Sequence, residues 1–400
     1  MKKIAIIFHR IGPYHFARAR ATAKVIDTTL IEAFKSDDTY QWDLVTGADG
    51  FVRTTVFEKS PESKDELVRG IQTALDACRP DAVAVPGWGD ALAFAAIQWC
   101  AANGVPAIVM SETTEWDEPR RPVKEWVKRR ILKLCTAGLA GGQPHADYLV
   151  MLGMSPATIF QGYDAVDNEY FAQKAGEARA QGVELRKKFG LPENYFLASA
   201  RFVEKKNLPN LVRAYAQYRN QAEKAKRPKS EIWDLVLLGD GHLKPELTSL
   251  ITGLGLQESV LLPGFKQYGE LPAYYALAKA FIHASTIEQW GLVVNEAMAS
   301  GLPVLVSHRC GCAHDLVQEN VNGFTFDPFN TEQIAGIMFR VSGSTFPIAS
   351  LGAASTRIIA NWSPDRFAQG LGQATDAALA APRVGLGMLD RLLLQLLSRR

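Results

Sequence analysis

Residues 281–301, FIHASTIEQWGLVVNEAMASG, begin with a short apolar run, continue through a polar turn and then show a helical pattern that ends at a second glycine. A strand-like apolar run followed by a helical pattern is typical of a βα unit. A helix that begins near Gly291 leaves the N–H groups of Gly291, Leu292 and Val293 without partners inside the helix, at the carboxyl end of the strand. The stretch therefore predicts a βα fold with a site for a diphosphate at the helix start.

Two glutamates flank this predicted anion site. Glu288 stands in the turn just before the helix, and Glu296 lies in the second turn of the helix. Ionised carboxylates accept strong hydrogen bonds, so the pair suits the hydroxyl groups of a nucleotide sugar. The spacing alone is weak evidence, because acidic residues recur by chance in helices, and Glu296 is equally consistent with an exposed helix position.

The same alternation of strand and helix patterns recurs along the chain. Strands are expected at residues 4–8, 42–46, 52–57, 82–86, 107–110, 138–140 and 159–161, then at 195–200, 235–238, 260–262, 281–284, 303–307 and 323–326. Helices are expected at 14–34, 64–78, 91–102, 123–135 and 364–380. Such alternation indicates parallel sheets covered by helices on both faces. The charged, alanine-rich stretch 172–188 indicates a linker between two such arrays.

Composition disfavours several classes of protein. The chain has 400 residues, of which 47% are apolar and 22% charged, as in an ordinary globular protein of about two or three domains. The net charge of +2 gives no reason to expect nucleic acid as a partner, and five scattered cysteines indicate reduced thiols in a cytoplasmic protein. Neither a leader peptide nor a membrane-spanning helix is expected, because no apolar run approaches roughly 20 residues. No metal site is expected, since Cys310 and Cys312 lack a second ligand pair at zinc spacing.

Four segments of the second half together resemble the donor-binding part of the retaining glycosyltransferases of family 4. They are ARFVEKKNLPNLVRAY (200–215), LLGDGHLKPEL (237–247), VLLPGFKQYGELPAYY (260–275) and GLVVNEAMASGLPV (291–304). The resemblance covers most of the second half and rests on the order of the segments, each at a predicted strand end. Taken alone, Arg201 and Lys206 would favour a solvated charge run, since Glu204 and Lys205 stand between them.

The resemblance implies the GT-B fold, in which two Rossmann-like domains face each other across a cleft. Residues 1–170 would form the acceptor-side domain and residues 171–362 the nucleotide-sugar donor domain. A helix at about 363–380 would cross back to pack on the first domain, and residues 381–400 would form an amphipathic tail.

The resemblance also assigns residues to the donor. Arg201, Lys206 and Glu288 would be the catalytic residues, with the two cations on the diphosphate and the glutamate on the sugar hydroxyls. Glu296 would bind the ribose. The remaining donor-binding positions would be Gly12, Gly264, Phe265, Gly291, Leu292 and Val293.

The first half departs from the family where the acceptor binds. Many members carry a histidine after the strand that corresponds to residues 107–110, whereas this chain has SETTEWDEP there. Glu112 or Ser111 takes that place, with Glu112 as the acceptor-side candidate, and His15 is the other candidate. The basic segment 120–134 and the leucine-rich tail 385–400 are consistent with peripheral contact at the inner face of a membrane. Packing within their own domain is the alternative for both segments.

The function implied is retaining transfer of a hexose-type sugar from a nucleoside-diphosphate sugar to a saccharide or lipid-linked acceptor, as in polysaccharide or glycoconjugate biosynthesis. The family requires neither a metal nor another cofactor for this reaction. Two alternatives stay open on the same architecture. One is a nucleotide-sugar 2-epimerase, and the other is a catalytically silent subunit that binds a partner transferase.

Overall fold

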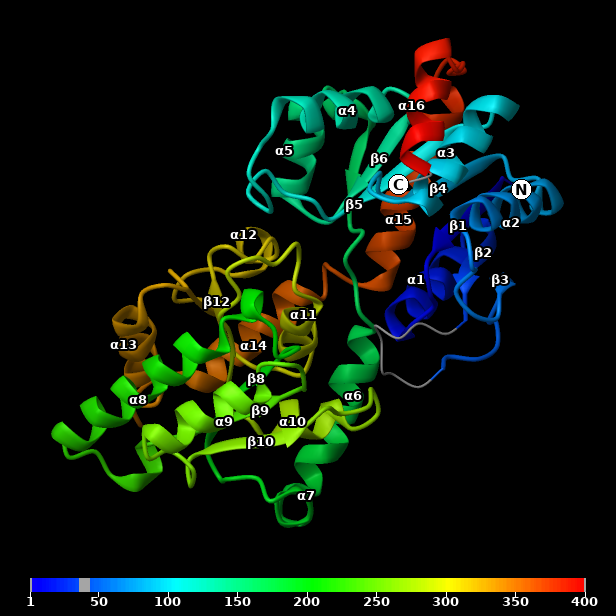
Figure 1. The fold of residues 1–400 in the computed structure, drawn as a ribbon. Coiled ribbons are helices and arrows are strands. Elements are labelled where there is room, and N and C mark those ends of the chain that lie inside the picture. Colours follow the sequence, from blue (N-terminus) through cyan, green and yellow to red (C-terminus); the bar gives the residue numbers. More distant parts are fainter. Residues whose placement is uncertain (1, 36–43, 399–400) are drawn as a thin grey trace. The chain divides into compact units, whose positions relative to one another are not determined.

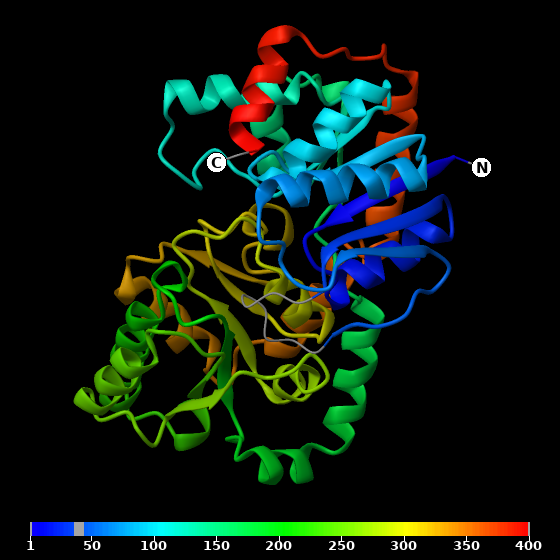
Figure 2. The same cartoon turned by 45° about the vertical axis from the view of Figure 1, so that its right-hand side comes forward.

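The computed structural model describes residues 2–35 and 44–398 and divides into two compact units. Unit 1 contains residues 1–167 together with 362–400, and unit 2 contains residues 168–361 (Figure 1). Each unit is built on one parallel sheet, and both sheets carry helices on their two faces (Figure 2).

The sheet of unit 1 has seven parallel strands in the order β3-β2-β1-β4-β5-β6-β7. The strands are β1 (Lys3–Phe8), β2 (Asp27–Phe34), β3 (Val52–Phe57), β4 (Ala82–Pro86), β5 (Ala107–Ser111), β6 (Ala137–Ala140) and β7 (Ile159–Gln161). Their helices are α1 (Pro13–Ala23), α2 (Lys64–Cys78), α3 (Ala91–Asn103), α4 (Pro122–Leu132) and α5 (Gln143–Met151), with a short 3₁₀ turn at Pro156–Thr158.

Side chains of β1 show why this sheet is covered on both faces. Ala5 and Ile7 pack into the cluster formed with α2 and α3, whereas Ile4 and Ile6 pack into the cluster formed with α1 and the helix of residues 364–380. Successive side chains of a strand point to opposite faces, so a continuous apolar run fits a strand buried on both sides.

The prediction of one helix over residues 14–34 is wrong. The helix α1 ends at Ala23, and residues 27–34 form β2, which pairs in parallel with β1 and β3. Residues 28–33 are all buried in this strand, including the β-branched Thr28 and Thr29. A fully buried strand lacks alternating polarity. The apolar residues of β2 therefore could not be distinguished from a continuation of the helical pattern of α1.

The strand expected at residues 42–46 is absent from the three of these residues that the structure describes. Residues 42 and 43 lie outside the described residues, and residues 44–46 have no regular secondary structure. The neighbouring β3 occurs at the expected residues, and it forms the edge of the sheet beside β2.

The C-terminal segment returns to unit 1 as two helices. Helix α15 (Pro364–Ala380) packs against α1, β6 and β7, and buries Phe367 and Leu371. Helix α16 (Met388–Ser398) packs against α3 and α2 through the buried Leu394.

Unit 2 contains six parallel strands in the order β10-β9-β8-β11-β12-β13. They are β8 (Tyr195–Ser199), β9 (Asp234–Leu238), β10 (Val260–Gly264), β11 (Ala280–His283), β12 (Val304–Ser307) and β13 (Gly323–Phe326). The helices are α6 (Asn168–Ala180), α7 (Gly182–Phe189), α8 (Leu208–Lys224), α9 (Lys244–Gly253), α10 (Leu271–Leu277), α11 (Leu292–Ala299), α12 (Ala313–Leu316), α13 (Thr331–Val341) and α14 (Ile348–Ile359), with 3₁₀ turns at Glu204–Lys206 and Lys229–Glu231. The six strands expected in this half are therefore confirmed.

The structure also shows the environment of the thiols and the hydropathy of the helices. All five cysteines are buried, and none forms a disulfide bond with another described residue. Among the helices of the described residues, none combines the length and the hydropathy needed to cross a bilayer.

Candidate functional site

The start of α11 lies at the carboxyl end of β11, as the sequence predicted. Gly291 is the N-cap and has a φ of 109°, a left-handed conformation that favours glycine. The first helical hydrogen bond runs from the N–H of Val294 to the carbonyl of Gly291, so the N–H groups before Val294 precede the helical ladder. These groups and the helix dipole favour an anion at this place.

Glu288 lies in the turn before α11 and is the centre of a polar cluster. Its Oε2 atom contacts the ammonium group of Lys206, accepts the Nε2–H of His283 at 2.8 Å and accepts the Ser285 hydroxyl at 3.2 Å. Burial alone would raise the pKa of Glu288, but the charge of Lys206 and the hydrogen bond from His283 hold the pKa well below its usual range. Glu288 is therefore ionised throughout the physiological pH range.

The two oxygens of this carboxylate differ in their surroundings. Oε2 receives all three donors, whereas Oε1 makes no hydrogen bond to a residue within the described ranges. The side chain of Glu288 is 14% exposed, so it is not sealed from solvent. This arrangement fixes the carboxylate through one oxygen and leaves the other to accept a hydroxyl group.

His283 is a site residue that the sequence analysis missed. It is the last residue of β11 and is only 3% exposed, and burial lowers its pKa even though the nearby Glu288 opposes the shift. A neutral imidazole with its proton on Nε2 donates to Glu288, and this fixes the tautomer. A histidine at the carboxyl end of a buried strand, five residues before Glu288, was the available signal.

Lys206 reaches this cluster from the loop after β8. The loop forms a 3₁₀ turn and ends at Asn207, which has a left-handed φ of 57° and is buried. The side-chain amide of Asn207 donates to the carbonyls of Ala284 at 3.1 Å and Pro328 at 2.7 Å. One side chain thereby ties together the loops after β8, β11 and β13.

Arg201 lies in the same loop and is exposed. Its side chain makes no hydrogen bond or ion pair with a residue that the structure describes. The backbone beside it is held by the turn after β9, where Phe202 N–H donates to the Asp240 carbonyl at 2.8 Å. A Cβ atom on Gly239 would lie 1.9 Å from the carbonyl oxygen of Ala200, so this close approach requires glycine.

The structure excludes one of the two interpretations of Glu296 from the sequence. It is not an exposed helix residue, because its side chain is fully buried in α11. It accepts a hydrogen bond of 2.5 Å from the Tyr275 hydroxyl, and burial together with the charge of Glu296 raises the pKa of Tyr275 well above its usual value. Its contact with a ribose stays a prediction.

The residues expected at the base lie at the end of β10. Gly264 has a φ of 82°, and its carbonyl accepts the N–H of Gly239 at 3.1 Å. Phe265 follows it and is half-buried. Both residues thus stand at the same edge of the sheet as the turn after β9, and their contact with a base stays a prediction.

In unit 1, Gly12 is the N-cap of α1, and its N–H donates to Nδ1 of His15 at 3.0 Å. Removal from water lowers the pKa of His15 to about 3, with further lowering by the charges of Arg18 and His9. His15 is therefore neutral and holds the loop after β1.

The loop after β1 is also held by Glu32, which the sequence analysis placed in a helix. Glu32 is 1% exposed and lies near the carboxyl end of β2. It accepts the N–H of Ile11 at 2.8 Å, while Arg53 and Thr55 donate to its other oxygen, each at 2.9 Å.

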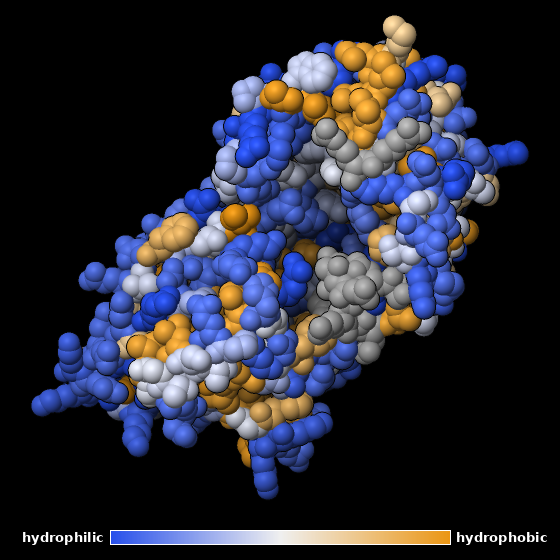
Figure 3. Space-filling model, viewed as in Figure 1, coloured by the Kyte–Doolittle hydropathy of each residue, from blue (hydrophilic) through white to orange (hydrophobic). Residues whose placement is uncertain are grey.

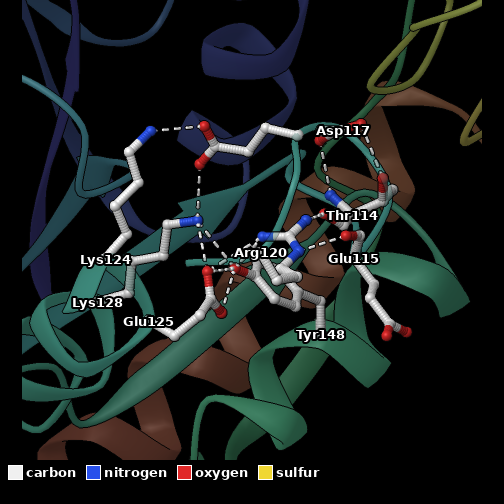
Figure 4. A network of polar contacts seen from close by, with 9 residues as sticks. Thr114, Glu115, Asp117, Arg120, Lys124, Glu125, Lys128 and Tyr148 are labelled. Atoms are coloured by element: carbon white, nitrogen blue, oxygen red, sulfur yellow. Dashed lines mark hydrogen bonds and ion pairs between the residues drawn. The ribbon is translucent and has the colours of Figure 1, made fainter. Parts of the chain in front are cut away.

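The acidic loop after β5 is largely engaged in its own unit. Asp117 accepts the N–H and the hydroxyl of Thr114 (Figure 4). Glu118 pairs with two lysines of α4. Glu112 follows β5 directly and is half-buried. Of the acidic residues in this loop, Glu112 therefore stays the acceptor-side candidate.

No cluster of three or more histidine, cysteine, aspartate or glutamate side chains suited to a metal ion occurs within residues 2–35 and 44–398. The residues expected to bind the donor or the acceptor thus lie in both units. Lys206, Glu288 and the helix start at Gly291 meet at the carboxyl ends of β8 and β11, with Glu296 buried in α11 behind them. Gly12 and His15 belong to unit 1.

Comparison with known proteins matches a segment of unit 2. Residues 183–341 match the family model described as glycosyl transferases group 1. The chain is 24% identical over 248 residues to an alpha-D-kanosaminyltransferase of Streptomyces kanamyceticus, covering 60% of this chain and 61% of the relative. It is 30% identical over 156 residues to an alpha-monoglucosyldiacylglycerol synthase of Acholeplasma laidlawii, covering 38% and 37%. The chain thus spans about a third to three fifths of these relatives.

Solved structures resemble the whole chain. Anabaena HepE in complex with UDP and glucose superposes with a TM-score of 0.72 at 18% identity, covering 94% of this chain and 100% of that one. Sucrose-phosphate synthase from Thermosynechococcus elongatus gives 0.72 at 16% identity, covering 96% and 100%. The two parallel-sheet units thus have the GT-B fold, and the match to the glycosyl transferases group 1 covers residues 183–341 of unit 2.

Proposed function

We propose that this protein is a retaining, metal-independent glycosyltransferase that moves a hexose-type sugar from a nucleoside-diphosphate sugar to a saccharide or lipid-linked acceptor. Three observations support the proposal: the family match over residues 183–341, the cluster around Glu288 and the activities for which the relatives are named. Those relatives include one named for a kanosaminyl group, one for a glucosyldiacylglycerol and one for a diphospho-undecaprenol acceptor.

The observation that carries the proposal is the arrangement of Glu288 three residues before Gly291. The ionised carboxylate is anchored through Oε2, and the helix start at Gly291 supplies N–H groups beside it. A sugar hydroxyl donating to Oε1 and a diphosphate at the helix start fit this pair of neighbouring sites. A nucleoside-diphosphate sugar contains both groups in one molecule.

Departure of the nucleoside diphosphate increases the negative charge on its terminal phosphate. Fixed positive groups at that place lower the barrier, because they interact more strongly with the transition state than with the bound donor. Arg201 supplies a charge with no partner among the described residues, and the start of α11 supplies oriented N–H groups. The charge of Lys206 is partly compensated by Glu288, so we assign it a second role in holding that carboxylate.

Retention follows when the acceptor attacks the face of the sugar that the phosphate leaves. In this scheme the leaving phosphate takes the proton of the acceptor hydroxyl, and the bond to the acceptor forms as the bond to phosphate breaks. The protein then needs to position the two substrates and stabilise charge, rather than supply a nucleophile.

Nucleotide release from a panel of UDP-, GDP- and ADP-sugars, with and without simple saccharide and lipid acceptors, tests the proposal. We expect acceptor-dependent release that survives excess chelator, and a product whose anomeric configuration by NMR equals that of the donor. Glu288→Gln should lower turnover, while Glu258→Gln, a change on an exposed residue, should not. Sugar epimerisation without transfer, an inverted product or release that requires a metal would contradict the corresponding part of the proposal.

A further inference from the structure

Helices α4 and α16 lie side by side in unit 1, although about 260 residues separate them in the chain. The guanidinium of Arg130 on α4 donates to Oδ1 of Asp390 on α16 at 2.5 Å. Figures 1 and 2 both draw the two helices as neighbours at one end of this unit. We call their outward residues the α4–α16 surface, and they are Arg121, Val123, Trp126, Arg129, Lys133, Met388, Leu389, Arg391, Leu392 and Leu396.

Large apolar side chains are exposed on both helices of this surface. Val123 is 75% exposed and Trp126 50% exposed on α4, and the exposed fractions on α16 are 82% for Met388, 49% for Leu389, 53% for Leu392 and 66% for Leu396. Figure 3 shows hydrophobic atoms gathered where Figure 1 draws these helices. Scattered exposed hydrophobic residues are ordinary, but six on two adjacent helices mark an interaction surface.

Acidic side chains near this surface are neutralised within unit 1. Glu118 accepts Lys124 at 2.8 Å and Lys128 at 3.1 Å, and the hydrogen bonds from these lysines lower its pKa to about 2. Glu125 is bound by Lys128 and by the Tyr148 hydroxyl (Figure 4). Lys124 and Lys128, which belong to the basic segment 120–134, are therefore engaged by acidic side chains of their own unit.

Four other cations of the two helices keep their charge available. Arg121, Arg129, Lys133 and Arg391 are exposed, and their side chains make no hydrogen bond or ion pair with a residue in the described part of the chain. Since Asp390 is held by Arg130, both acidic residues within 121–133 and 387–398 are internally paired. The outward charge of the α4–α16 surface is therefore positive.

We propose that the α4–α16 surface docks the protein on an anionic lipid bilayer. The combination of leucines, a half-exposed tryptophan and unpaired cations suits the boundary between lipid head groups and acyl chains. A second copy of the chain fits worse, because a two-fold interface would bring the same four cations against each other. The proposal concerns binding alone and does not depend on the sugar transfer proposed above.

Vesicle co-sedimentation of the full chain, without donor or acceptor, tests this proposal. Vesicles of phosphatidylcholine and vesicles with added phosphatidylglycerol are compared at low and at high salt. The charge variant is Arg129→Ser/Lys133→Ser/Arg391→Ser, and the apolar variant is Trp126→Ser/Leu392→Ser/Leu396→Ser. The controls remove exposed side chains elsewhere: two cations of α8 in Arg213→Ser/Lys224→Ser, and one apolar residue of α7, 87% exposed, in Val183→Ser.

Wild type should pellet with the anionic vesicles, and high salt should release it. Removing three cations should weaken binding to these vesicles at least about tenfold, because each basic residue near an anionic surface contributes roughly a factor of five. The apolar variant should also bind less, and the controls should bind like wild type. All changed side chains are exposed, so each variant should keep the wild-type melting temperature.

Absence of wild-type binding to anionic vesicles at low salt would overturn the proposal, as would unaltered binding of either surface variant. Equal binding to phosphatidylcholine would overturn its electrostatic part. Sedimentation equilibrium measures whether the protein is a monomer or a dimer in solution. A wild-type dimer that Leu392→Ser converts to a monomer would assign the surface to contact between copies instead.

Discussion

The ammonium group of Lys206 contacts Oε2 of Glu288, and 82 residues of chain separate the two. Both side chains are mostly buried, with 12% and 14% of their surface exposed. Removing one partner of such a pair leaves the other charge with reduced solvation and without its counter-ion. The contact between these two proposed donor residues thus links catalysis to the stability of unit 2.

A double-mutant cycle measures this link. Lys206→Met should destabilise unit 2 by about 3 kcal/mol, because Glu288 then lacks its cation, and Lys206→Met/Glu288→Gln should be more stable than Lys206→Met. Denaturant unfolding of the four proteins measures the coupling. If the effects of the two substitutions simply add, Lys206 and Glu288 do not interact in solution.

A substitution of Arg201 should change turnover without changing stability. Arg201→Ala should lower turnover at least tenfold, since a hydrogen bond to a charged group is worth about 1.5–3 kcal/mol and about 1.4 kcal/mol corresponds to tenfold in rate. Its side chain is exposed and unpaired among the described residues, so the melting temperature should stay unchanged. Initial-rate kinetics beside Arg213→Ala, a change on the exposed face of α8, makes the comparison. Equal rates for Arg201→Ala and wild type would remove Arg201 from the site.

The low pKa of His15 makes the stability of unit 1 depend on pH. Its pKa is about 3 in the folded protein, against 6.5 for an unperturbed histidine, so the unfolded chain binds the proton first as the pH falls. The contribution of His15 to stability is thus fully present above pH 6.5 and decreases by about 1.4 kcal/mol per pH unit between pH 6 and 4. His15→Gln keeps an acceptor for the Gly12 N–H, because glutamine fits the third position of a capping box, but it does not titrate. Unfolding at pH 7, 5.5 and 4 should show a smaller loss of stability for this variant, and parallel curves would refute the assignment.

Asn207 combines a left-handed backbone with two hydrogen bonds, and two substitutions separate these contributions. Asn207→Gly keeps access to a φ of 57° and loses the hydrogen bonds to Ala284 and Pro328, whereas Asn207→Ala loses both. We expect both variants to raise KM for the donor, and Asn207→Ala to be less stable than Asn207→Gly by about 1 kcal/mol. Donor kinetics and thermal unfolding measure the two effects. Wild-type KM in both variants would show that the clamp does not position the donor loop.

The strands of unit 2 were predictable because each is a short apolar run bounded by turn residues. The helix start at Gly291 was predictable for a related reason, since a glycine follows the polar turn and precedes the helical pattern. In unit 1 the same reasoning failed at β2, where buried Thr28 and Thr29 continued the apolar pattern of α1. Periodicity distinguishes a half-buried strand from a helix, but not a fully buried one.

Contacts between loops were beyond the reach of sequence patterns. The bond from His283 to Glu288 and the pairing of Glu118 with Lys124 and Lys128 depend on how separate loops and helices fold against one another. The basic segment 120–134 therefore suggested a larger free charge than the structure presents. Its neutralising acid lies just outside the segment, in a loop that has no periodicity of its own.

The amide of Asn207 has a consequence for redesign of donor preference. Because it binds the carbonyls of Ala284 and Pro328, the loop that carries Lys206 cannot be exchanged for a homologous loop by itself. A graft that replaces only residues 200–207 would leave two carbonyls facing a side chain of different length or direction. Chimeras that alter the donor should transfer the loops after β8, β11 and β13 as one set, from a single parent.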